Sequence, residues 1–329
     1  MAIGVADLDY LRHQLEARRH KLQQAVARSQ TANLVQLLEQ VDKALEKVDT
    51  GTFGICEDCH ERIETSRLIA DPLIEVCLGC LKPSEQRALE QDLTLAARIQ
   101  AGLLPQKDFQ AAGWRVSYHY EPAGLVSGDY CDLVYHDKDL YFMVGDVAGK
   151  GVAASMLMAN LHAMFRVLIP TGFPLPQLVE RANRIFADST LPGQYATLIV
   201  GRARACGEVE LCNGGHLPPI HLATGGVNTL SSSALPVGMF HDQEFLSTQI
   251  NFSPGDSLVV YTDGFTESAG RDDAEYGETR LTRLLETRHG HNPRELVDAC
   301  VRDLHSFGSG SPRLDDQTLM VLKFAPVQH

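Results

Sequence analysis

The sequence predicts an α+β protein in which antiparallel sheets are flanked by helices, preceded by a helical hairpin that carries a zinc site. The first observation is a series of short β-like runs at hairpin spacing between residues 114 and 324, separated by two groups of helical segments. The second is a pair of Cys-x-x-Cys motifs, which follows two segments with helical periodicity in the first 80 residues.

Composition and charge describe an ordinary globular chain of 329 residues, long enough for two domains. Its formal net charge of −13 argues against non-specific binding to nucleic acid or to an anionic membrane. The first residues lack the basic and apolar regions of a signal peptide, and the most apolar helical segment, 152–169, is interrupted by Asn160, His162 and Arg166. We therefore expect a cytoplasmic protein whose eight cysteines are reduced or metal-bound.

Two segments at the N-terminus have the periodicity of amphipathic helices. Leucine and alanine recur at helical spacing over 8–25, and apolar residues follow a three-four spacing over 34–48. Residues 29–33 break the pattern, so we predict two antiparallel helices in a short coiled-coil hairpin. The apolar stripes could serve only to seal the hairpin onto itself, or they could bind a partner.

Four cysteines follow the predicted hairpin as two Cys-x-x-Cys pairs, Cys56 with Cys59 and Cys77 with Cys80. Each pair offers two thiolates, and four thiolates complete the tetrahedron that zinc prefers. Because four protein ligands leave no open position, we expect one structural Zn²⁺. A dithiol redox pair or a chance spacing would be the alternatives, although a redox motif needs only one pair.

These cysteines belong to a run over about residues 34–84 that resembles the zinc finger of the DksA/TraR family. The residues that carry the resemblance are Thr50-Gly51-Thr52-Phe53-Gly54-Ile55-Cys56-Glu57-Asp58-Cys59, Ile63, Arg67-Leu68, Pro72 and Cys77-Leu78-Gly79-Cys80. Members of that family reach into RNA polymerase with acidic residues at a coiled-coil tip. The predicted tip here, 29–33, holds no acidic residue, so the resemblance implies the fold of the module rather than polymerase regulation.

A further helix is expected over residues 84–104, which lack proline until Pro105 ends the segment. Its apolar side is formed by Leu89, Leu93, Ala96, Ile99 and Leu103. The helix could pair across a homodimer and pass strain to the following domain, or it could be a packed link without a signalling role. The predicted organisation is a zinc-finger module over 1–83, a linker helix over 84–104 and a larger domain over 105–329.

The larger domain is expected to mix strands and helices. Its β-like runs fall near 114–120, 132–135, 139–144, 194–205, 207–213, 217–222, 246–251, 257–262 and 317–324. Its helical blocks fall near 150–169, 175–189 and, in a mixed stretch, 277–307.

The stretch from Tyr141 to Gly151 ends an apolar run in Gly145-Asp146 and continues as a glycine-rich turn. A carboxylate at the end of a buried strand, beside exposed backbone amides and carbonyls, can hold a hard cation or a phosphate. The spacing to Gly149-Lys150 is one residue short of a Walker A loop, and Gly151 stands where Ser or Thr is needed. Taken alone, the motif could equally be a surface turn with a capping aspartate.

Three other strand ends carry aspartate in the same setting. They are Ser127-Gly128-Asp129, Tyr261-Thr262-Asp263-Gly264 and Leu314-Asp315-Asp316-Gln317-Thr318. If the fold brings the four ends together, cations must offset their repulsion, and oxygen-only ligands favour magnesium or manganese over zinc. Two ions about 3.5–4 Å apart would lower the pKa of a bridging water and clamp a phosphoryl group for in-line attack. No protein nucleophile is required, and no G-x-S-x-G elbow is present.

An ordered set of motifs over about residues 95–324 resembles the SpoIIE/RsbU branch of the metal-dependent, type-2C-like (PPM) protein serine/threonine phosphatases. The set comprises Ala97-Arg98-Ile99-Gln100-Ala101-Gly102-Leu103-Leu104-Pro105, Ser127-Gly128-Asp129-Tyr130-Cys131-Asp132, Gly145-Asp146-Val147-Ala148-Gly149-Lys150-Gly151, Asn213-Gly214-Gly215-His216, Leu235-Pro236-Val237-Gly238, Tyr261-Thr262-Asp263-Gly264-Phe265-Thr266-Glu267 and Asp315-Asp316-Gln317-Thr318. The resemblance implies an α-β-β-α sandwich of two antiparallel sheets and a site for two Mn²⁺ or Mg²⁺ ions. Ser127 replaces a glycine that the family often has there, a small change that leaves the carboxylate in place, so we expect an active enzyme.

The resemblance also implies a set of metal ligands. Asp146 would bridge both ions, and the backbone carbonyl of Val147 would be a second central ligand. Asp129 would bind a metal or a metal-bound water, and Asp263 and Asp315 would complete the set.

Four further residues of these motifs are candidates for supporting roles. Asp316 is a possible additional metal ligand, but strand alternation would turn its side chain away from Asp315. Asp132 should face away from Asp129 for the same reason, so we interpret it as a supporting or structural residue. His216 is a candidate for a structural hydrogen bond or for proton transfer, and Lys150 for the substrate phosphate or for solvent.

The leading hypothesis is a cytoplasmic phosphatase that hydrolyses phosphoserine and phosphothreonine in proteins with a metal-activated water. The resemblance implies bacterial signalling, with a phosphorylated STAS-type anti-sigma factor antagonist as substrate and a homodimer formed through the linker helix. The alternative is a zinc-finger transcription regulator that binds RNA polymerase and has a regulatory C-terminal domain. A third hypothesis is a phosphatase that rests inactive until a partner orders its metal site.

Overall fold

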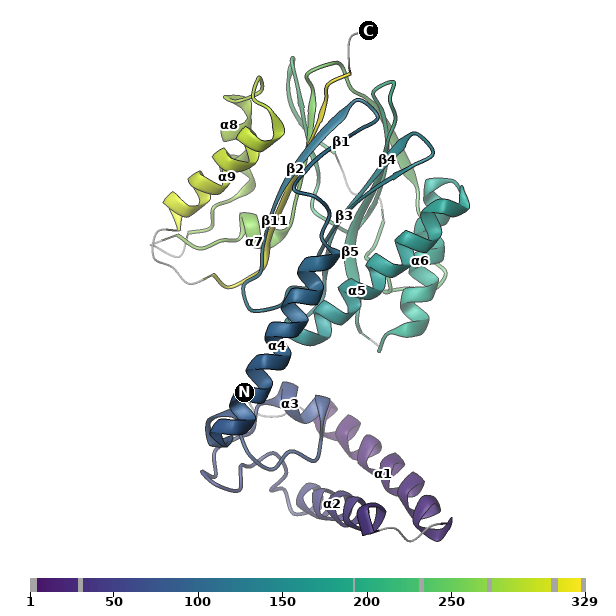
Figure 1. Ribbon diagram of the computed structural model, residues 1–329, viewed down its shortest axis with the longest axis vertical. Helices are drawn as coiled ribbons and strands as arrows, with labels where there is room; N and C mark the ends of the chain where they lie inside the picture. The colour runs from purple at the N-terminus through teal and green to yellow at the C-terminus, as the bar shows by residue number, and fades with distance from the viewer. Residues whose placement is uncertain are drawn as a thin grey trace. The chain divides into compact units, whose positions relative to one another are not determined.

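The computed structural model describes residues 5–28, 32–191, 193–230, 234–270, 274–308 and 313–326 (Figure 1). The chain divides into two compact units, Met1–Asp92 and Leu93–His329, and the division falls inside helix α4 (Pro83–Leu103). Most of the predicted hairpin tip, residues 29–31, lies outside the described residues.

The smaller unit combines a helical hairpin with a cysteine module. Its elements are α1 (Val5–Arg28), α2 (Ala32–Asp49), α3 (Thr65–Ala70) and the 3-10 turn η1 (Leu78–Cys80). Leu15 of α1 and Val41 of α2 are fully buried in one core, so these parts of the two apolar stripes cover each other. Leu11 of α1 packs with Ile63 and Leu68, so the hairpin and the cysteine module share apolar contacts.

In the larger unit, the described strands form two antiparallel sheets, which confirms the predicted fold class. One sheet has the order β1 (Asp108–Ala111), β2 (Trp114–Glu121), β11 (Gln317–Phe324), β10 (Ser257–Tyr261), β7 (Ile220–Ala223) and β8 (Gly226–Thr229). The other has the order β3 (Asp129–His136), β4 (Asp139–Val147), β5 (Ala196–Ala203), β6 (Glu208–Gly214) and β9 (Ser247–Asn251).

Helices cover the outer faces of both sheets. They are α5 (Gly151–Leu168), the 3-10 turn η2 (Ile169–Thr171), α6 (Leu175–Ser189), α7 (Asp263–Thr266), α8 (Glu278–Glu286) and α9 (Pro293–Phe307). Figure 1 shows α5 and α6 on the side of the five-stranded sheet, with α8 and α9 on the side of the six-stranded sheet. The larger unit is therefore the α-β-β-α sandwich that the resemblance implies.

Three apolar cores hold these four layers together. Trp114, Phe142 and Val260 lie in the core between the two sheets. Met143 faces the opposite way from Phe142 and packs with α5 and α6, whereas Val259 packs with α8 and α9. Side chains of successive residues in one strand thus pack into cores on opposite faces of the sheet, as the two-residue period of a strand requires.

One described helical segment, Gly151–Thr171, has the length and hydropathy of a membrane span. Met158, Leu161 and Phe165 of this segment are buried in the core against the five-stranded sheet. A core helix of a folded domain passes the same composition test, so its apolar character is explained by the packing of α5.

Three elements of the larger unit, β1, β8 and α7, were not predicted from the pattern of apolar residues. β1 and β8 are four-residue edge strands with two and three exposed side chains, so each is too short to show a clear apolar period. Helix α7 is a single turn that begins at Asp263. The mixed stretch 277–307 is two helices, and α9 begins with a capping box between Asn292 and Glu295.

Candidate functional site

Four strand ends from both sheets meet in an acidic cluster, defined here as Asp129, Asp146, Asp263 and Asp315. Asp129 opens β3 and pairs directly with Asp146 near the end of β4. Asp263 follows β10, and Asp315 precedes β11, which pairs with β10 in the other sheet. Burial, and then the charges of neighbouring aspartates, raise the pKa of Asp146 to about 7. The neighbours that exert this effect are Asp263, Asp315 and Asp316, so the cluster gathers around Asp146.

Two glycines allow these strand ends to come close together. A Cβ on Gly128 would lie 3.2 Å from the carbonyl oxygen of Val147 and 3.5 Å from a carboxylate oxygen of Asp146. A Cβ on Gly264 would lie 2.0 Å from the carbonyl oxygen of Asp316, which no side chain could tolerate. Both oxygens beside Gly128 thus face the same small space, as the proposed roles of Val147 and Asp146 require.

Asp129 is held from the opposite sheet by two threonine hydroxyls. Thr318 donates a hydrogen bond of 2.6 Å to its Oδ2, and Thr262 donates one of 2.9 Å to the same oxygen. Only 1% of the Asp129 surface is exposed. Burial and the charge of Asp146 raise the pKa of Asp129 well above its usual range. Asp129 therefore joins the two sheets at the edge of the cluster.

Lys150 is the cation that contacts Asp315. Its Nζ lies 2.8 Å from Asp315 Oδ2 and donates a second hydrogen bond of 2.8 Å to the carbonyl of Leu314. The residue immediately precedes α5, and its pKa is raised by the bond to Asp315. Because both side chains are substantially exposed, the pair is accessible to a ligand that approaches the cluster.

Asp316, a possible additional metal ligand, accepts backbone hydrogen bonds at both of its carboxylate oxygens. Its Oδ1 accepts a hydrogen bond of 2.7 Å from the backbone amide of Ala123, and its Oδ2 accepts one of 2.8 Å from that of Gly128. Since each carboxylate oxygen already has an amide donor, the side chain holds the segment 123–128 in place. These bonds agree with the expectation that strand alternation turns Asp316 away from Asp315.

Asp132 lies on the far side of β3 from Asp129, against α5. Arg166 donates two hydrogen bonds to its carboxylate, of 2.9 and 2.6 Å, and His162 Nδ1 lies 3.2 Å away. The carboxylate is fully buried, so these bonds tie α5 to the sheet. Asp132 thus holds α5 against the five-stranded sheet, in agreement with its interpretation as a supporting or structural residue.

His216 lies between the sheets and contacts two polar groups. Its Nδ1 is 2.8 Å from the hydroxyl of Thr197, and its Nε2 is 3.0 Å from the carbonyl of Tyr261. Burial lowers the pKa of His216 to about 4, so the imidazole is neutral near pH 7.

The acidic cluster has the ligand chemistry of a site for hard cations. All of its side-chain donors are oxygen, and negative charge accumulates around Asp146. Among the described residues, only the four cysteines bring three or more ligand side chains within 4.8 Å of one another. Two ions about 3.5–4 Å apart could be held by carboxylates that are spread more widely than these sulfurs.

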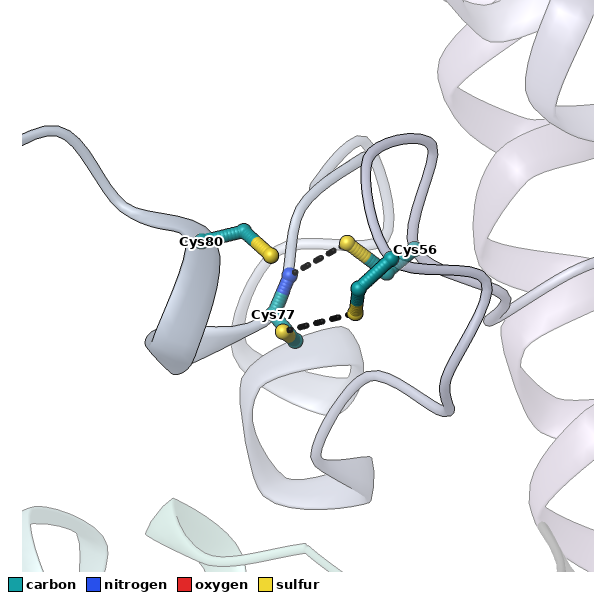
Figure 2. Close-up of side chains that lie close together, drawn as sticks. Cys56, Cys77 and Cys80 are labelled. Carbon is teal, nitrogen blue, oxygen red and sulfur yellow. Dashed lines mark hydrogen bonds between the residues drawn. The ribbon is translucent and has the colours of Figure 1, made fainter.

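The four cysteines form a separate, closed cluster. The sulfurs of Cys56, Cys59, Cys77 and Cys80 all lie within 4.8 Å of one another. Figure 2 shows the backbone amide of Cys77 donating to the sulfur of Cys56, at 3.3 Å. Backbone amides, first that of Cys59, lower the pKa of Cys56 to about 6, which favours the thiolate form. Four thiols with this spacing fit a tetrahedral zinc ion.

Comparisons with known families agree with this geometry. A family model described as stage II sporulation protein E (SpoIIE) matches residues 136–325, more than half of the chain. The chain belongs to the SpoIIE family. A second model, the prokaryotic DksA/TraR C4-type zinc finger, matches residues 51–86 of this SpoIIE-family protein.

Individual relatives share most of the SpoIIE-family unit. Protein IcfG of Synechocystis sp. is 27% identical over 261 residues, which is 70% of this chain and 41% of IcfG. Phosphoserine phosphatase RsbU of Bacillus subtilis is 24% identical over 242 residues, which is 72% of this chain and 71% of RsbU. The solved SiaA-PP2C domain of Pseudomonas aeruginosa has a TM-score of 0.64 at 18% identity and covers 74% of this chain and 100% of the domain. That last likeness establishes the fold alone.

The structure also reveals supporting residues to which the sequence analysis gave no role. Thr262 and Thr318 flank predicted ligands, but their common target, Asp129, is distant in the chain. Gln100 of α4 is buried, accepts a hydrogen bond from the amide of Ser127 and donates one to its carbonyl, at 2.9 and 2.7 Å. A glutamine at helical spacing from the apolar residues Ala96 and Leu103 was the available signal for that contact.

Proposed function

We propose that this SpoIIE-family protein is a protein phosphatase for phosphoserine and phosphothreonine that depends on two Mn²⁺ or Mg²⁺ ions. The observation that carries the proposal is the meeting of four strand-end aspartates from two sheets around Asp146. Such a site needs no protein nucleophile, because the ions, when bound, would activate a water and neutralise the phosphoryl charge. The name of RsbU, a phosphoserine phosphatase, agrees with this chemistry.

Each group of the cluster has a proposed task. Asp146 and the carbonyl of Val147 would hold the ions at the centre, and Asp263 and Asp315 would hold them from the other sheet. Asp129, fixed by its threonine bonds, would orient a ligand at the edge of the cluster. Lys150 would exchange its bond to Asp315 for one to a phosphoryl oxygen of the substrate.

Hydrolysis of p-nitrophenyl phosphate and of a phosphoserine peptide with Mn²⁺ tests the activity. Asp146→Asn should reduce kcat at least about a hundredfold, since it removes a central charge at the site. Asp137→Asn is the matched control, because it is the same change at the exposed turn of the same β3–β4 hairpin. That turn residue has a positive φ, which asparagine tolerates. An inactive wild type, or full activity in Asp146→Asn, would refute the proposal.

The proposed substrate is a phosphorylated STAS-type anti-sigma factor antagonist. Support comes from the resemblance to the RsbU branch and from similarity to RsbU itself. The test is release of phosphate from a purified phosphoserine form of such an antagonist, compared with an unrelated phosphoserine protein at the same concentration. Equal kcat/KM values for the two proteins would contradict the assignment.

The proposed organisation is the one expected from the sequence, with a module over 1–83, a linker helix over 84–104 and a catalytic domain over 105–329. The cysteine cluster would hold one structural Zn²⁺, and the linker helix would form a homodimer. Metal analysis of the purified chain should give one zinc per chain, and Leu95→Glu on the exposed face of α4 should yield monomers. Zinc-free protein, or dimers in Leu95→Glu, would count against these assignments.

The zinc-finger match favours one second candidate, a regulator that binds RNA polymerase. This function predicts that the full chain co-purifies with the polymerase and that substitutions in the zinc-finger module abolish the interaction. The phosphatase proposal predicts no such dependence for its catalytic activity.

A further inference from the structure

The motif Asn213-Gly214-Gly215-His216 has no role in the acidic cluster itself, yet it places an imidazole between the two sheets. Only 3% of the His216 surface is exposed. The Tyr261 carbonyl can only accept a hydrogen bond, so His216 Nε2 carries the proton. His216 Nδ1 therefore accepts the hydroxyl hydrogen of Thr197. Both ring nitrogens are thus engaged inside the protein.

Both partners of His216 adjoin aspartates of the acidic cluster. Thr197 of β5 is the direct ladder partner of Asp146 on β4. Tyr261 ends β10, two residues before Asp263. The imidazole therefore spans the distance between the strand beside Asp146 and the strand end that carries Asp263.

The rest of the motif fixes the imidazole in place. The amide of His216 donates to Asn213 Oδ1 at 2.8 Å, and Asn213 Nδ2 donates to the carbonyl of His216 at 3.1 Å. Gly215 has a φ of +68°, and a Cβ there would lie 2.7 Å from a ring carbon of Pro236. Any other residue at position 215 would be strained and would displace the loop. Asn213 and Gly215 therefore both contribute to the position of the imidazole.

We propose that His216 is a positioning residue, a neutral strut between Thr197 and Tyr261 that sets the separation of Asp146 and Asp263. The inference rests on the proposed phosphatase function. The contacts between the sheets are mostly apolar and not directional, so directional hydrogen bonds are needed to fix one sheet against the other near the ligands. His216 exchanges no proton during the reaction, because its one ring proton is already donated to a core carbonyl.

Changes at both ends of the strut test this role. His216→Gln can still donate to the Tyr261 carbonyl, but its amide oxygen lies one bond further from the backbone than Nδ1 and so is not placed to accept from Thr197. Thr197→Val removes the same bond from the other side. His216→Ala removes both bonds. Thr197→Ser keeps the hydroxyl and is the matched control. The measurements are Mn²⁺ affinity by calorimetry and kcat and KM for p-nitrophenyl phosphate and a phosphoserine peptide.

We expect His216→Gln and Thr197→Val to weaken Mn²⁺ binding and to lower kcat by matching factors of about ten, with a larger loss in His216→Ala. KM should change less than about twofold, and the pH profile of kcat/KM should keep its shape, because no titrating group is lost. Both substrates should lose activity by the same factor. Thr197→Ser should behave as the wild type does.

Two results would overturn the inference. If His216→Gln and Thr197→Val lose thermal stability but keep wild-type Mn²⁺ affinity and kcat, the strut is merely structural. If the phosphoserine peptide loses at least tenfold more activity than p-nitrophenyl phosphate, whose leaving group needs little protonation, His216 acts as an acid. Should the histidine variants fail to fold, the Thr197 pair decides alone. A wild type that binds Mn²⁺ without hydrolysing either substrate would refute the proposed function. The Mn²⁺ affinities of the His216 and Thr197 variants would then still test the strut.

Discussion

Asp146→Asn should stabilise the larger unit in the absence of Mn²⁺ and Mg²⁺, although it removes catalysis. The reason is that burial and neighbouring carboxylates raise the pKa of Asp146 to about 7, from an ordinary value of 3.8. A carboxyl group with a raised folded-state pKa contributes stability that is complete below 3.8 and is lost as the pH rises through 7. At pH 8 the folded protein therefore carries the full cost of the charge, and asparagine removes that cost.

The size of the effect follows from the two pKa values. Their difference corresponds to about 4 kcal/mol at pH 8, which is an upper limit because Asp146 is only partly buried. We expect about 2 kcal/mol. At pH 5 the Asp146 carboxyl group is protonated in most folded wild-type molecules, so the advantage of Asp146→Asn should fall by more than half.

The single tryptophan makes the measurement selective. Trp114 is buried in the core between the two sheets, so its fluorescence during urea unfolding follows the larger unit. Samples should be freed of Mn²⁺ and Mg²⁺ on a chelating resin, with the zinc content checked afterwards. Asp137→Asn again serves as the control, and its stability should differ from wild type by less than about 0.5 kcal/mol at either pH.

Saturating Mn²⁺ should reverse the order of stability. An ion present at a hundred times its dissociation constant stabilises the protein that binds it by about 2.7 kcal/mol, and Asp146→Asn should bind weakly. If Asp146→Asn lowers stability at pH 8 without Mn²⁺, or raises it equally at pH 5 and pH 8, the carboxylates do not repel one another as the structure implies.

Three other perturbations have expected outcomes of their own. Lys150→Ala should raise KM for a phosphoserine peptide about tenfold. Calorimetry should also show tighter Mn²⁺ binding, because no ammonium group then competes for Asp315. Unchanged KM and Mn²⁺ affinity would mean that Lys150 is merely solvated. Asp132→Asn should destabilise the larger unit by about 2–3 kcal/mol in urea, while the kcat of the folded fraction stays within about twofold of wild type. A kcat loss of tenfold would give Asp132 a part in catalysis. Cys77→Ser should unfold the cysteine module, seen as lost zinc and lost helical signal, while the Trp114 transition stays within about 0.5 kcal/mol; a shifted transition would show that the two units depend on each other.

The predicted strand ends illustrate how much of the site the sequence contains. Asp129, Asp146 and Asp263 were selected because each lies where a β-like run meets a turn or a glycine, and a sandwich of two sheets brings such ends together. The alternation of side chains along a strand was enough to expect that Asp132 and Asp316 face away from the ligands. Local pattern therefore predicted which aspartates point toward the cluster, with Asp316 kept as a possible additional ligand.

Contacts across the sandwich were harder to predict. Nothing near His216 in the chain indicates Thr197 or Tyr261 as partners, because those residues meet only when the two sheets pack. The same is true of Thr318 and Asp129, which lie in different sheets. Short edge strands were missed for a different reason, since a four-residue strand with an exposed face has too few apolar positions to show a period.

The two hydrogen bonds between Gln100 and Ser127 are expected to form and break together. One side-chain amide serves both backbone groups of Ser127, so a small slip of α4 along its axis would break both bonds together. Two backbone groups deep in the protein would then lack partners, at a cost of about 1–3 kcal/mol each. Ser127 stands two residues before Asp129, and its hydroxyl accepts a bond from the Asp129 amide. A displacement of the end of α4 would therefore also displace Asp129, the first residue of β3.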